Sequence, residues 1–517
     1  MKKLYYTLAA LASFQMSLNA QVYSTAILDG NNVEANVNNG GIFFNDVVNQ
    51  SPGFEYPKGS EKHLIYANTF WFGTEDNSGN KKLAAQLYNL GEDLFTGPLV
   101  PGQATGSQVP SLEKDIHQVT KSEIDYHIAN YTTAGYVVSQ SIANWPAHGD
   151  VLQGYDFYLA PFVDVNGDGM YSPEEGDYPL IRGDYATYMI LNDKLDVHAS
   201  GGDPLGVECH FMFYQYNTSD YLDNTVFLNL KVINRSTIDY PEFKVGCFLD
   251  PDIGNGADDA VGCDTNQRVM YAYNFSNNDD VYGENPPAIG VVNLNQSMDV
   301  FGYFSDDLGE MTLPNTAADY HNFLDGHWKD GSAFTFGENG YGGMTTTKHL
   351  FSGNPNIPGE WSELEAGLFP SESRMFMVSN IGPLLNQEEI CLDYAFVVGD
   401  GGDHLENVNH LLSIAAEVQN FYNSQDDLVC AYFGETLGMD AHEIKSPTVY
   451  PNPSNGQITI DFTGEYSVEI HALDGRKVFE SAKMQDTNTI YPTIESGSYM
   501  LSVIQNGNRH SKTIVVR

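Results

Sequence analysis

The chain has 517 residues, which is more than one hydrophobic core usually holds, so we expect two or more domains. It contains 68 acidic and 24 basic residues and carries a net charge of -44 at pH 7. Such a surface repels phosphate backbones and anionic lipid headgroups, so nucleic acid is excluded as an expected partner.

The first twenty residues have the pattern of a secretory signal peptide. Lys2 and Lys3 precede an apolar run over residues 4–18, and Ala20 ends a small-residue cleavage site before Gln21. No later stretch reaches the roughly 18 consecutive apolar residues of a membrane span, so we expect no transmembrane segment. The sequence predicts that the mature chain is exported.

Residues 21–433 are predicted to form a mainly β body, which can comprise two subdomains. β-Branched and aromatic runs alternate there with Gly, Asn, Asp and Pro, as expected for strands and turns. The strand-like runs lie at 62–73, 188–193, 210–216, 226–236, 243–250, 268–275, 374–380 and 391–400.

The stretch DVNGDGMYSPEEGD at residues 164–177 has the ligand spacing of a calcium loop. Oxygen donors fall at positions one, three, five, seven, nine and twelve, where the seventh acts through its carbonyl and the ninth through water. Gly169 permits the sharp turn after position five, and Tyr171 fills the usual anchoring position. The predicted ligands are Asp164, Asn166, Asp168, Met170, Ser172 and Glu175.

The alternative interpretation of this stretch is an acidic, glycine-rich surface turn. A strand-like run precedes it, and Gly176, Pro179 and Gly183 leave room for little more than one helical turn after it. The paired long helices of calcium sensors are therefore not expected. We predict a structural Ca²⁺ ion that clips the loop, with no role in catalysis or switching.

A second acidic stretch at residues 250–264, DPDIGNGADDAVGCD, matches no defined calcium loop. A second calcium site and a solvated loop are equally compatible with it. The sequence contains no GxSxG, HExxH or Walker A motif, and we assign no catalytic residue. Distant acid pairs for glycoside hydrolysis stay open, because such residues meet only in the fold.

The five cysteines cannot all pair with one another. Cys209 lies in a run whose residues 207, 209, 211 and 213 alternate onto one strand face, which favours a buried free thiol. In an exported protein Cys247 can pair with Cys263, and Cys391 with Cys430, but sequence alone does not fix the connectivity.

One amphipathic helix is predicted at the C-terminal end of the body. Asp403 and Glu406 form a capping box at its start. Its apolar stripe at helical spacing consists of Leu405, Val408, Leu411, Leu412, Ala415, Val418 and Tyr422.

Residues 434–446 are predicted to be a linker, and residues 447–517 a small Ig-like β-sandwich of short alternating strands. The segment 447–517 carries seven acidic and six basic residues. The acidity therefore belongs to the body.

The motifs YPNPSNG, ALDGRKVFE, ESGSYMLSVIQNG and KTIVVR follow one another in residues 447–517. This order resembles the type A C-terminal sorting domain of Bacteroidota type IX secretion substrates. The resemblance implies export by the type IX machinery and removal of the domain by a sortase-like peptidase. The body would then be secreted into the medium or attached to lipopolysaccharide at the outer-membrane surface.

Segments of the body at 54–73, 164–184, 257–264, 325–343 and 395–405 resemble an uncharacterised family of large exported Bacteroidota proteins. We expect a non-enzymatic binding, adhesion or structural role at the cell surface. The alternatives are a secreted hydrolase acting on polysaccharide and a carbohydrate-binding protein. The four tryptophans could stack on sugars, although core packing is the stronger expectation for isolated tryptophans.

Overall fold

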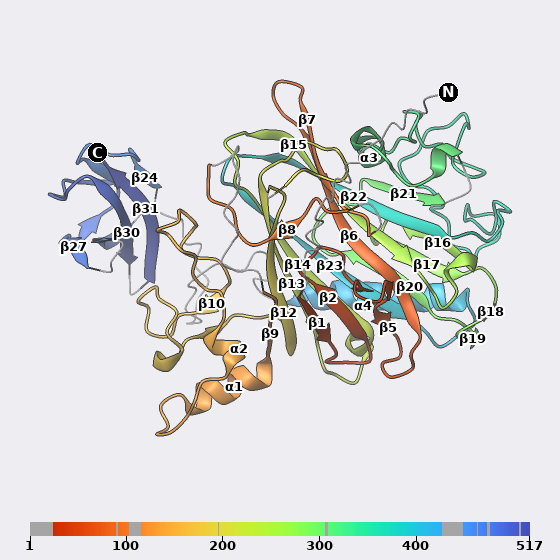
Figure 1. The fold of residues 1–517 in the computed structure, drawn as a ribbon, viewed down its shortest axis with the longest axis horizontal. Helices are drawn as coiled ribbons and strands as arrows, with labels where there is room; N and C mark the ends of the chain where they lie inside the picture. Colours follow the sequence, from red (N-terminus) through yellow and green to blue (C-terminus); the bar gives the residue numbers. More distant parts are fainter. Residues whose placement is uncertain are drawn as a thin grey trace, which may run out of the picture. The chain divides into compact units, whose positions relative to one another are not determined.

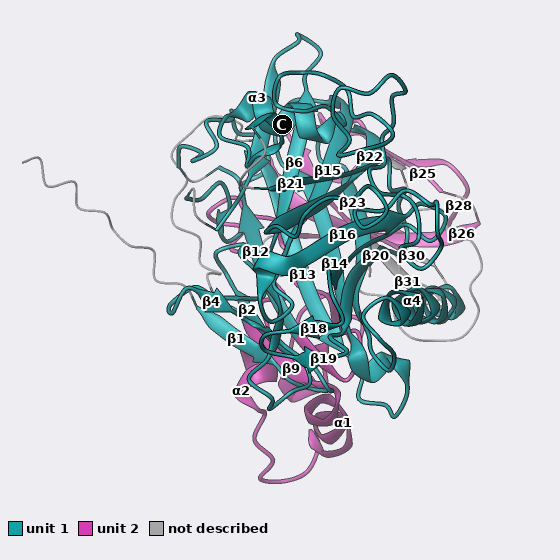
Figure 2. Cartoon of the chain, turned by 90° about the vertical axis from the view of Figure 1, so that its right-hand side faces the viewer, with its two compact units in different colours: residues 1–116, 187–426 teal, residues 117–186, 427–517 magenta. Residues whose placement is uncertain are grey.

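A computed structural model describes residues 24–88, 91–102, 115–194, 196–305, 309–425, 448–462, 464–472, 476–505 and 508–517. The predicted signal peptide and linker lie outside these residues. The chain divides into two compact units, Met1–Ile116 with Thr187–Asp426 and His117–Ala186 with Asp427–Arg517 (Figure 2). Strands dominate both units, which confirms the mainly β class.

The first unit contains two large antiparallel sheets (Figure 1). The first sheet has the order β1 (Thr25–Leu28), β2 (Glu34–Asn38), β5 (Phe54–Glu55), β6 (His63–Glu75), β15 (Tyr240–Pro251), β22 (Ser373–Leu384) and β21 (Val300–Ser305), with β7 (Lys81–Ala85) on β6.

The second sheet has the order β16 (Asp259–Asp264), β17 (Val269–Asn274), β20 (Ala288–Asn293), β23 (Glu389–Gly399), β14 (Thr225–Asn234), β13 (Val207–Gln215), β12 (Tyr185–Asn192) and β8 (Phe95–Thr96). Short elements complete the unit: β3 (Asn45–Asp46) with β4 (Ser51–Pro52), β18 (Asn278–Asp279) with β19 (Gly283–Glu284), and the 3₁₀ turns η2 (Tyr221–Asn224), η3 (Gly256–Asp258) and η4 (Gly309–Met311).

An aromatic layer joins the two sheets. The Phe70 ring of β6 lies 5.5 Å from the Tyr394 ring of β23, and Phe43 lies 4.9 Å from Phe211 of β13. All nine residues of β13 are buried. The residues that alternate with Cys209 along β13 are therefore also buried, because this sheet is covered on both faces.

Helix α4 (Glu406–Ser424) packs on β20 and β23 of the second sheet (Figure 1). A Cβ on Gly399 would lie 2.3 Å from the Asn407 carbonyl oxygen, so only glycine permits this approach. The Glu406 N–H donates to Asp403 Oδ1 at 2.9 Å, and the Asp403 N–H donates to Glu406 Oε2 at 3.2 Å. Both the helix and its reciprocal capping pair are confirmed.

Helix α3 (Ala317–Leu324) covers part of the first sheet. Leu324 packs against Gly73 of β6 and Gly246 of β15, and the Tyr320 ring meets the Trp71 ring edge-on at 5.1 Å. All four tryptophans of the chain are buried. Core packing, and not an exposed sugar-stacking platform, accounts for them.

The cysteine predictions had different outcomes. Cys209 is a buried free thiol, as predicted. The pairing of Cys247 with Cys263 is wrong, because both are buried free thiols on strands of different sheets. Cys391 is disulfide-bonded. Its expected partner, Cys430, lies outside the described residues.

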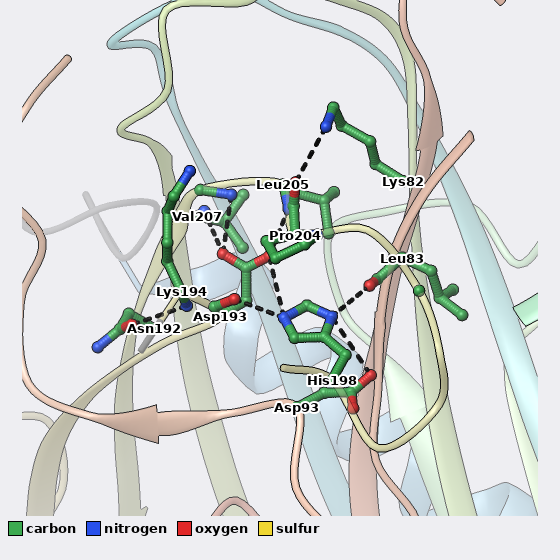
Figure 3. A network of polar contacts seen from close by, with 12 residues as sticks. Lys82, Leu83, Asp93, Asn192, Asp193, Lys194, His198, Pro204, Leu205 and Val207 are labelled. Atoms are coloured by element: carbon green, nitrogen blue, oxygen red, sulfur yellow. Dashed lines mark hydrogen bonds and ion pairs between the residues drawn. The ribbon is translucent and has the colours of Figure 1, made fainter. Parts of the chain in front are cut away.

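The connection between β12 and β13 is organised by a buried carboxylate (Figure 3). Asp193 accepts hydrogen bonds from the N–H groups of Leu205, Gly206 and Val207 at 2.6 to 2.8 Å. The His198 ring bridges the backbone oxygens of Leu83 and Asp193, at 2.7 and 2.5 Å. Backbone groups therefore supply most of the polar partners of this carboxylate.

In the second unit, residues 117–186 contain β9 (His117–Thr120), α1 (Lys121–Asn130), α2 (Gln140–Ala143), β10 (Phe162–Val163), the 3₁₀ turn η1 (Pro173–Glu175) and β11 (Tyr178–Pro179). Helix α1 was not predicted, although a capping box starts it: Thr120 and Glu123 each bond the other's backbone N–H.

The C-terminal segment 448–517 of this unit forms two antiparallel sheets that share one apolar core. The first contains β24 (Thr448–Tyr450), β25 (Ile458–Asp461) and β29 (Asn488–Ile490). The second contains β27 (Lys477–Glu480), β26 (Glu465–Ala472), β30 (Gly497–Gln505) and β31 (Asn508–Val516), with β28 (Met484–Gln485) on β26. The predicted succession of short strands is confirmed.

The buried carboxyl of Glu363 predicts a pH-dependent stability. Burial raises the pKa of Glu363 to about 8, whereas an unfolded Glu titrates near about 4.3. Between these two pKa values the Glu363 carboxyl is protonated in the folded chain and ionised in the unfolded chain. The free energy of unfolding therefore falls as pH rises through this range, and the loss is complete above about pH 8. Glu363→Gln keeps an oxygen acceptor for the Val261 N–H and should raise the melting temperature relative to wild type at pH 9 but not at pH 5. Melting curves that shift equally at both pH values would contradict this assignment.

Candidate calcium loop and acidic pocket

The predicted calcium loop connects a short antiparallel strand pair, β10 and β11. Gly167 and Gly169 turn the chain with φ values of 75° and 81°, a region that side chains other than glycine rarely adopt. The last three residues of the twelve-residue ligand pattern form the 3₁₀ turn η1, and the strand β11 is the next element after it. Within the described part of residues 117–186, the flanking helices of a calcium sensor are absent, as predicted.

Asp164 organises the start of the loop. Its Oδ1 accepts from the Gly167 N–H and its Oδ2 from the Gly169 N–H, both at 2.7 Å. The Asp168 N–H adds a longer bond of 3.3 Å to Oδ1. These bonds wrap the backbone around the first predicted ligand, and its side chain is buried.

The other predicted ligands lie in the same loop. Asn166 Nδ2 donates to Glu175 Oε2 at 2.6 Å and reaches Asp168 Oδ2 at 3.4 Å, so positions three, five and twelve converge. Met170 exposes its side chain, and its N–H donates to Asp168 Oδ1 at 2.7 Å. Ser172 precedes η1 and accepts from the Glu175 N–H through its carbonyl.

The donor atoms of the loop suit Ca²⁺, but their present arrangement does not yet form a binding site. The loop offers only oxygen donors, the type that Ca²⁺ prefers. Among the described residues, no three His, Cys, Asp or Glu side chains are arranged to hold a metal ion. The carboxylates instead accept from N–H groups, so binding requires Asn166 to turn its amide oxygen inward and release Glu175.

Tyr171 anchors the loop, as its position predicts. Its hydroxyl donates to the Ile142 carbonyl at 2.7 Å, and its ring meets Phe162 edge-on at 5.3 Å. Its N–H donates to His148 Nε2 at 2.8 Å. The loop is thereby attached to the residues just before it in the chain.

Sequence reasoning missed Asp177, which closes the base of the loop. This fully buried carboxylate accepts from the Val165 and Ser172 N–H groups, each at 2.8 Å. Burial raises the pKa of Asp177 above its ordinary value. Asp177 lies two residues beyond the twelve-residue ligand pattern, so the pattern did not indicate this role.

We expect Asp177→Ala to destabilise the loop strongly. The substitution leaves two partly buried N–H groups without their carboxylate acceptor, at up to about 1–3 kcal/mol for each. Glu174→Ala removes the same charge from an exposed neighbour and is the matched control, with an expected change below about 0.5 kcal/mol. Chemical denaturation of the mature chain measures both changes. Similar small effects for the two variants would show that Asp177 does not hold the loop.

The acidic stretch 250–264 does not form a single loop. Asp250 is the second-last residue of β15, whereas Asp259 and Asp264 are the first and last residues of β16. Between these strands, the Asp252 carboxylate accepts from the Gly256 N–H at 2.7 Å, and the Asp259 carboxylate accepts from the Ile253 N–H at 2.9 Å. Backbone N–H groups therefore bind one oxygen each of Asp252 and Asp259, whereas Oδ1 of Asp258 and Oδ1 of Asp259 are buried without a hydrogen-bond partner in the described part of the chain.

One end of this stretch lines a pocket of about 240 Å³ in the first unit. The lining residues are Tyr66, Tyr88, Asp250, Pro251, Asp252 and Glu372. Burial raises the pKa of Asp250 to about 7 and that of Asp252 to about 6.

Arg374 is buried beside the pocket and orders its acids. Its Nε lies 3.3 Å from Asp250 Oδ2 and 3.2 Å from the Tyr88 hydroxyl, and its second guanidinium nitrogen lies 2.6 Å from Glu372 Oε1. The pocket residues come from positions 66 to 372, which is why no local motif revealed the site.

Comparison with known families identifies the C-terminal domain. Residues 448–517 match the model of the secretion system C-terminal sorting domain, within one residue of the predicted start. The chain is a type IX secretion substrate. Its sorting domain indicates export to the extracellular space or the cell surface and implies the secretion machinery as a partner.

The other comparisons leave the body of this secretion substrate without an assigned activity. The chain has no match among the curated proteins. A solved structure titled a polysaccharide lyase is 8% identical, with a TM-score of 0.19, and the match covers 60% of this chain. The matched region spans about a third (34%) of that lyase. This similarity supports no argument about fold or activity.

In the part of the secretion substrate that the structure describes, no helix is both long and apolar enough to cross a membrane.

Proposed function

We propose that this type IX secretion substrate is a calcium-stabilised, non-catalytic protein of the cell surface, with a binding, adhesion or structural role. The observation that carries the proposal is the wrapping of the loop backbone around Asp164 by the Gly167 and Gly169 N–H groups. This arrangement supports Asp164 as the first ligand of an oxygen-donor loop.

The negative charge of the loop favours the binding of a cation. Asp168 and Glu175 are exposed on a chain with a net charge of -44, and the Asn166 amide is their shared hydrogen-bond donor. A bound Ca²⁺ ion would remove the repulsion between these carboxylates. The proposed ligands are Asp164, Asn166, Asp168, Met170 through its carbonyl, Ser172 through water, and Glu175.

The proposal includes processing at the surface. A sortase-like peptidase would cut the linker, and the body would be released or attached to surface lipopolysaccharide. The linker composition supports this step, because Gly434, Gly438 and Ser446, with Pro447 directly after them, are typical of exposed segments between independently folded units.

Removal of calcium should lower the stability of the mature chain. Extracellular calcium modules have dissociation constants of roughly 10⁻⁴ to 10⁻³ M, so 1 mM Ca²⁺ adds about 0.4 to 1.4 kcal/mol. We expect a chelator to lower the melting temperature of wild type and of the exposed-site control Glu174→Ala. Asp168→Ala should melt at the same temperature with and without calcium. Magnesium should substitute poorly, because its small octahedral shell does not suit six or more protein oxygens.

A wild-type melting temperature that is unchanged by both chelator and added calcium would contradict the calcium assignment. An equal loss of the calcium response in Glu174→Ala would show that general charge, and not the loop, produces the effect.

Deletion of residues 448–517 should stop surface export. The truncated chain lacks the sorting domain and should accumulate in the periplasm, whereas the full chain reaches the surface or the medium. Cell fractionation with a body-specific antibody distinguishes these outcomes, and a strain without type IX secretion is the control for retention. Normal export of the truncated chain would show that the domain is not its sorting signal.

The second candidate is a secreted hydrolase or binding protein for polysaccharide. It is favoured by the pocket, where Asp250, Asp252 and Glu372 line one cavity and two of the carboxyls have pKa values near neutrality. A raised pKa is what a general acid requires. The burial of all four tryptophans counts against an aromatic platform for sugars.

A further inference from the structure

We propose that the acidic pocket binds an organic cation, namely a lysine-type primary ammonium on an alkyl chain. The inference goes beyond the proposed function, which assigns no ligand to the body. It rests on the charge of the pocket lining, the arrangement of its two tyrosines and its size.

The pocket lining carries an excess of negative charge. Three of its six residues are carboxylic acids and none is basic. The adjacent guanidinium of Arg374 contacts Asp250 and Glu372, so one positive charge faces two acids. Asp252 accepts from the Gly256 N–H, and within the described part of the chain it has no ion pair. A ligand that reaches Asp252 therefore gains most by carrying a positive charge.

The two tyrosines provide a second feature that suits a cation. Tyr66 and Tyr88 both line the pocket, and their rings lie 4.8 Å apart with an interplanar angle of 59°. The Tyr66 hydroxyl donates to the Gln50 carbonyl at 3.1 Å, and the Tyr88 hydroxyl accepts from Arg374. Both rings are thereby fixed. Aromatic faces attract ammonium groups, by about 0.5–2 kcal/mol.

The dimensions favour a single alkylammonium group. Pockets for drug-sized ligands measure about 300–1,000 Å³, and this one has about 240 Å³. A bare metal ion would make no use of the tyrosines and apolar Pro251. A neutral sugar would leave the charge of Asp252 uncompensated.

The test is titration of the mature chain with Nα-acetyl-lysine methylamide at pH 8, above the pKa of about 6 for Asp252. The neutral norleucine analogue, a methyl glycoside and Ca²⁺ are the comparison ligands, and calorimetry measures all four. We expect the lysine derivative to bind, with a dissociation constant that rises with salt, and the norleucine analogue to bind at least tenfold more weakly.

Variants connect this binding to the pocket. Asp252→Asn and the exposed-rim variant Glu372→Gln should each weaken the lysine derivative about tenfold. Glu417→Gln on the exposed face of α4 removes one charge elsewhere and should leave binding unchanged. A melting curve for each variant confirms that it is folded, and the Glu372 variant keeps the test decisive if Asp252→Asn is unstable.

The proposal is overturned if the lysine derivative does not bind, if the norleucine analogue binds equally well, or if Glu417→Gln causes the same loss. Binding of the glycoside alone would overturn it in favour of the polysaccharide candidate, and binding of Ca²⁺ alone would indicate a metal site. None of these results affects the calcium loop in the other unit, whose test is the melting of Asp168→Ala.

Discussion

The structure depends on how a chain with 68 acidic and 24 basic residues compensates its buried carboxylates. Among the described residues, most buried carboxylates accept hydrogen bonds from backbone N–H groups. Asp193 and Asp164 each accept three such bonds, and Asp177 accepts two. Hydrogen bonds to an ionised group contribute about 1.5–3 kcal/mol each, so these carboxylates fix the loops that surround them.

In the sorting domain, basic side chains compensate the acidic ones. Its charges nearly balance, and it contains direct ion pairs such as Lys477 with Glu469 and Lys483 with Glu465. These pairs are exposed or partly exposed, so they contribute little to stability. In the described part of the body, Asp168 and Glu175 are exposed acids without an ion pair, and the proposed Ca²⁺ ion would compensate their charge. The calcium loop and the ammonium pocket are two proposed instances of this one constraint.

The sequence predicted the features that depend on local patterns. Helix α4 has a long apolar stripe, and Tyr171 occupies a fixed position in a known loop, so both were found. Helix α1 was missed because it buries only Ile124 and His127, which gives almost no periodic signal. The pocket and the state of Cys247 could not be predicted, because both depend on which distant strands become neighbours.

The most direct test of the account is the anomalous diffraction of crystals of the mature chain grown with several millimolar calcium. The account predicts a calcium peak inside the loop, with oxygens of Asp164, Asp168 and Glu175 at about 2.3–2.6 Å and the Asn166 amide turned away from Glu175. A loop that keeps Asn166 on Glu175, with no peak at this calcium concentration, would contradict the central claim that a cation completes the compensation of these acids.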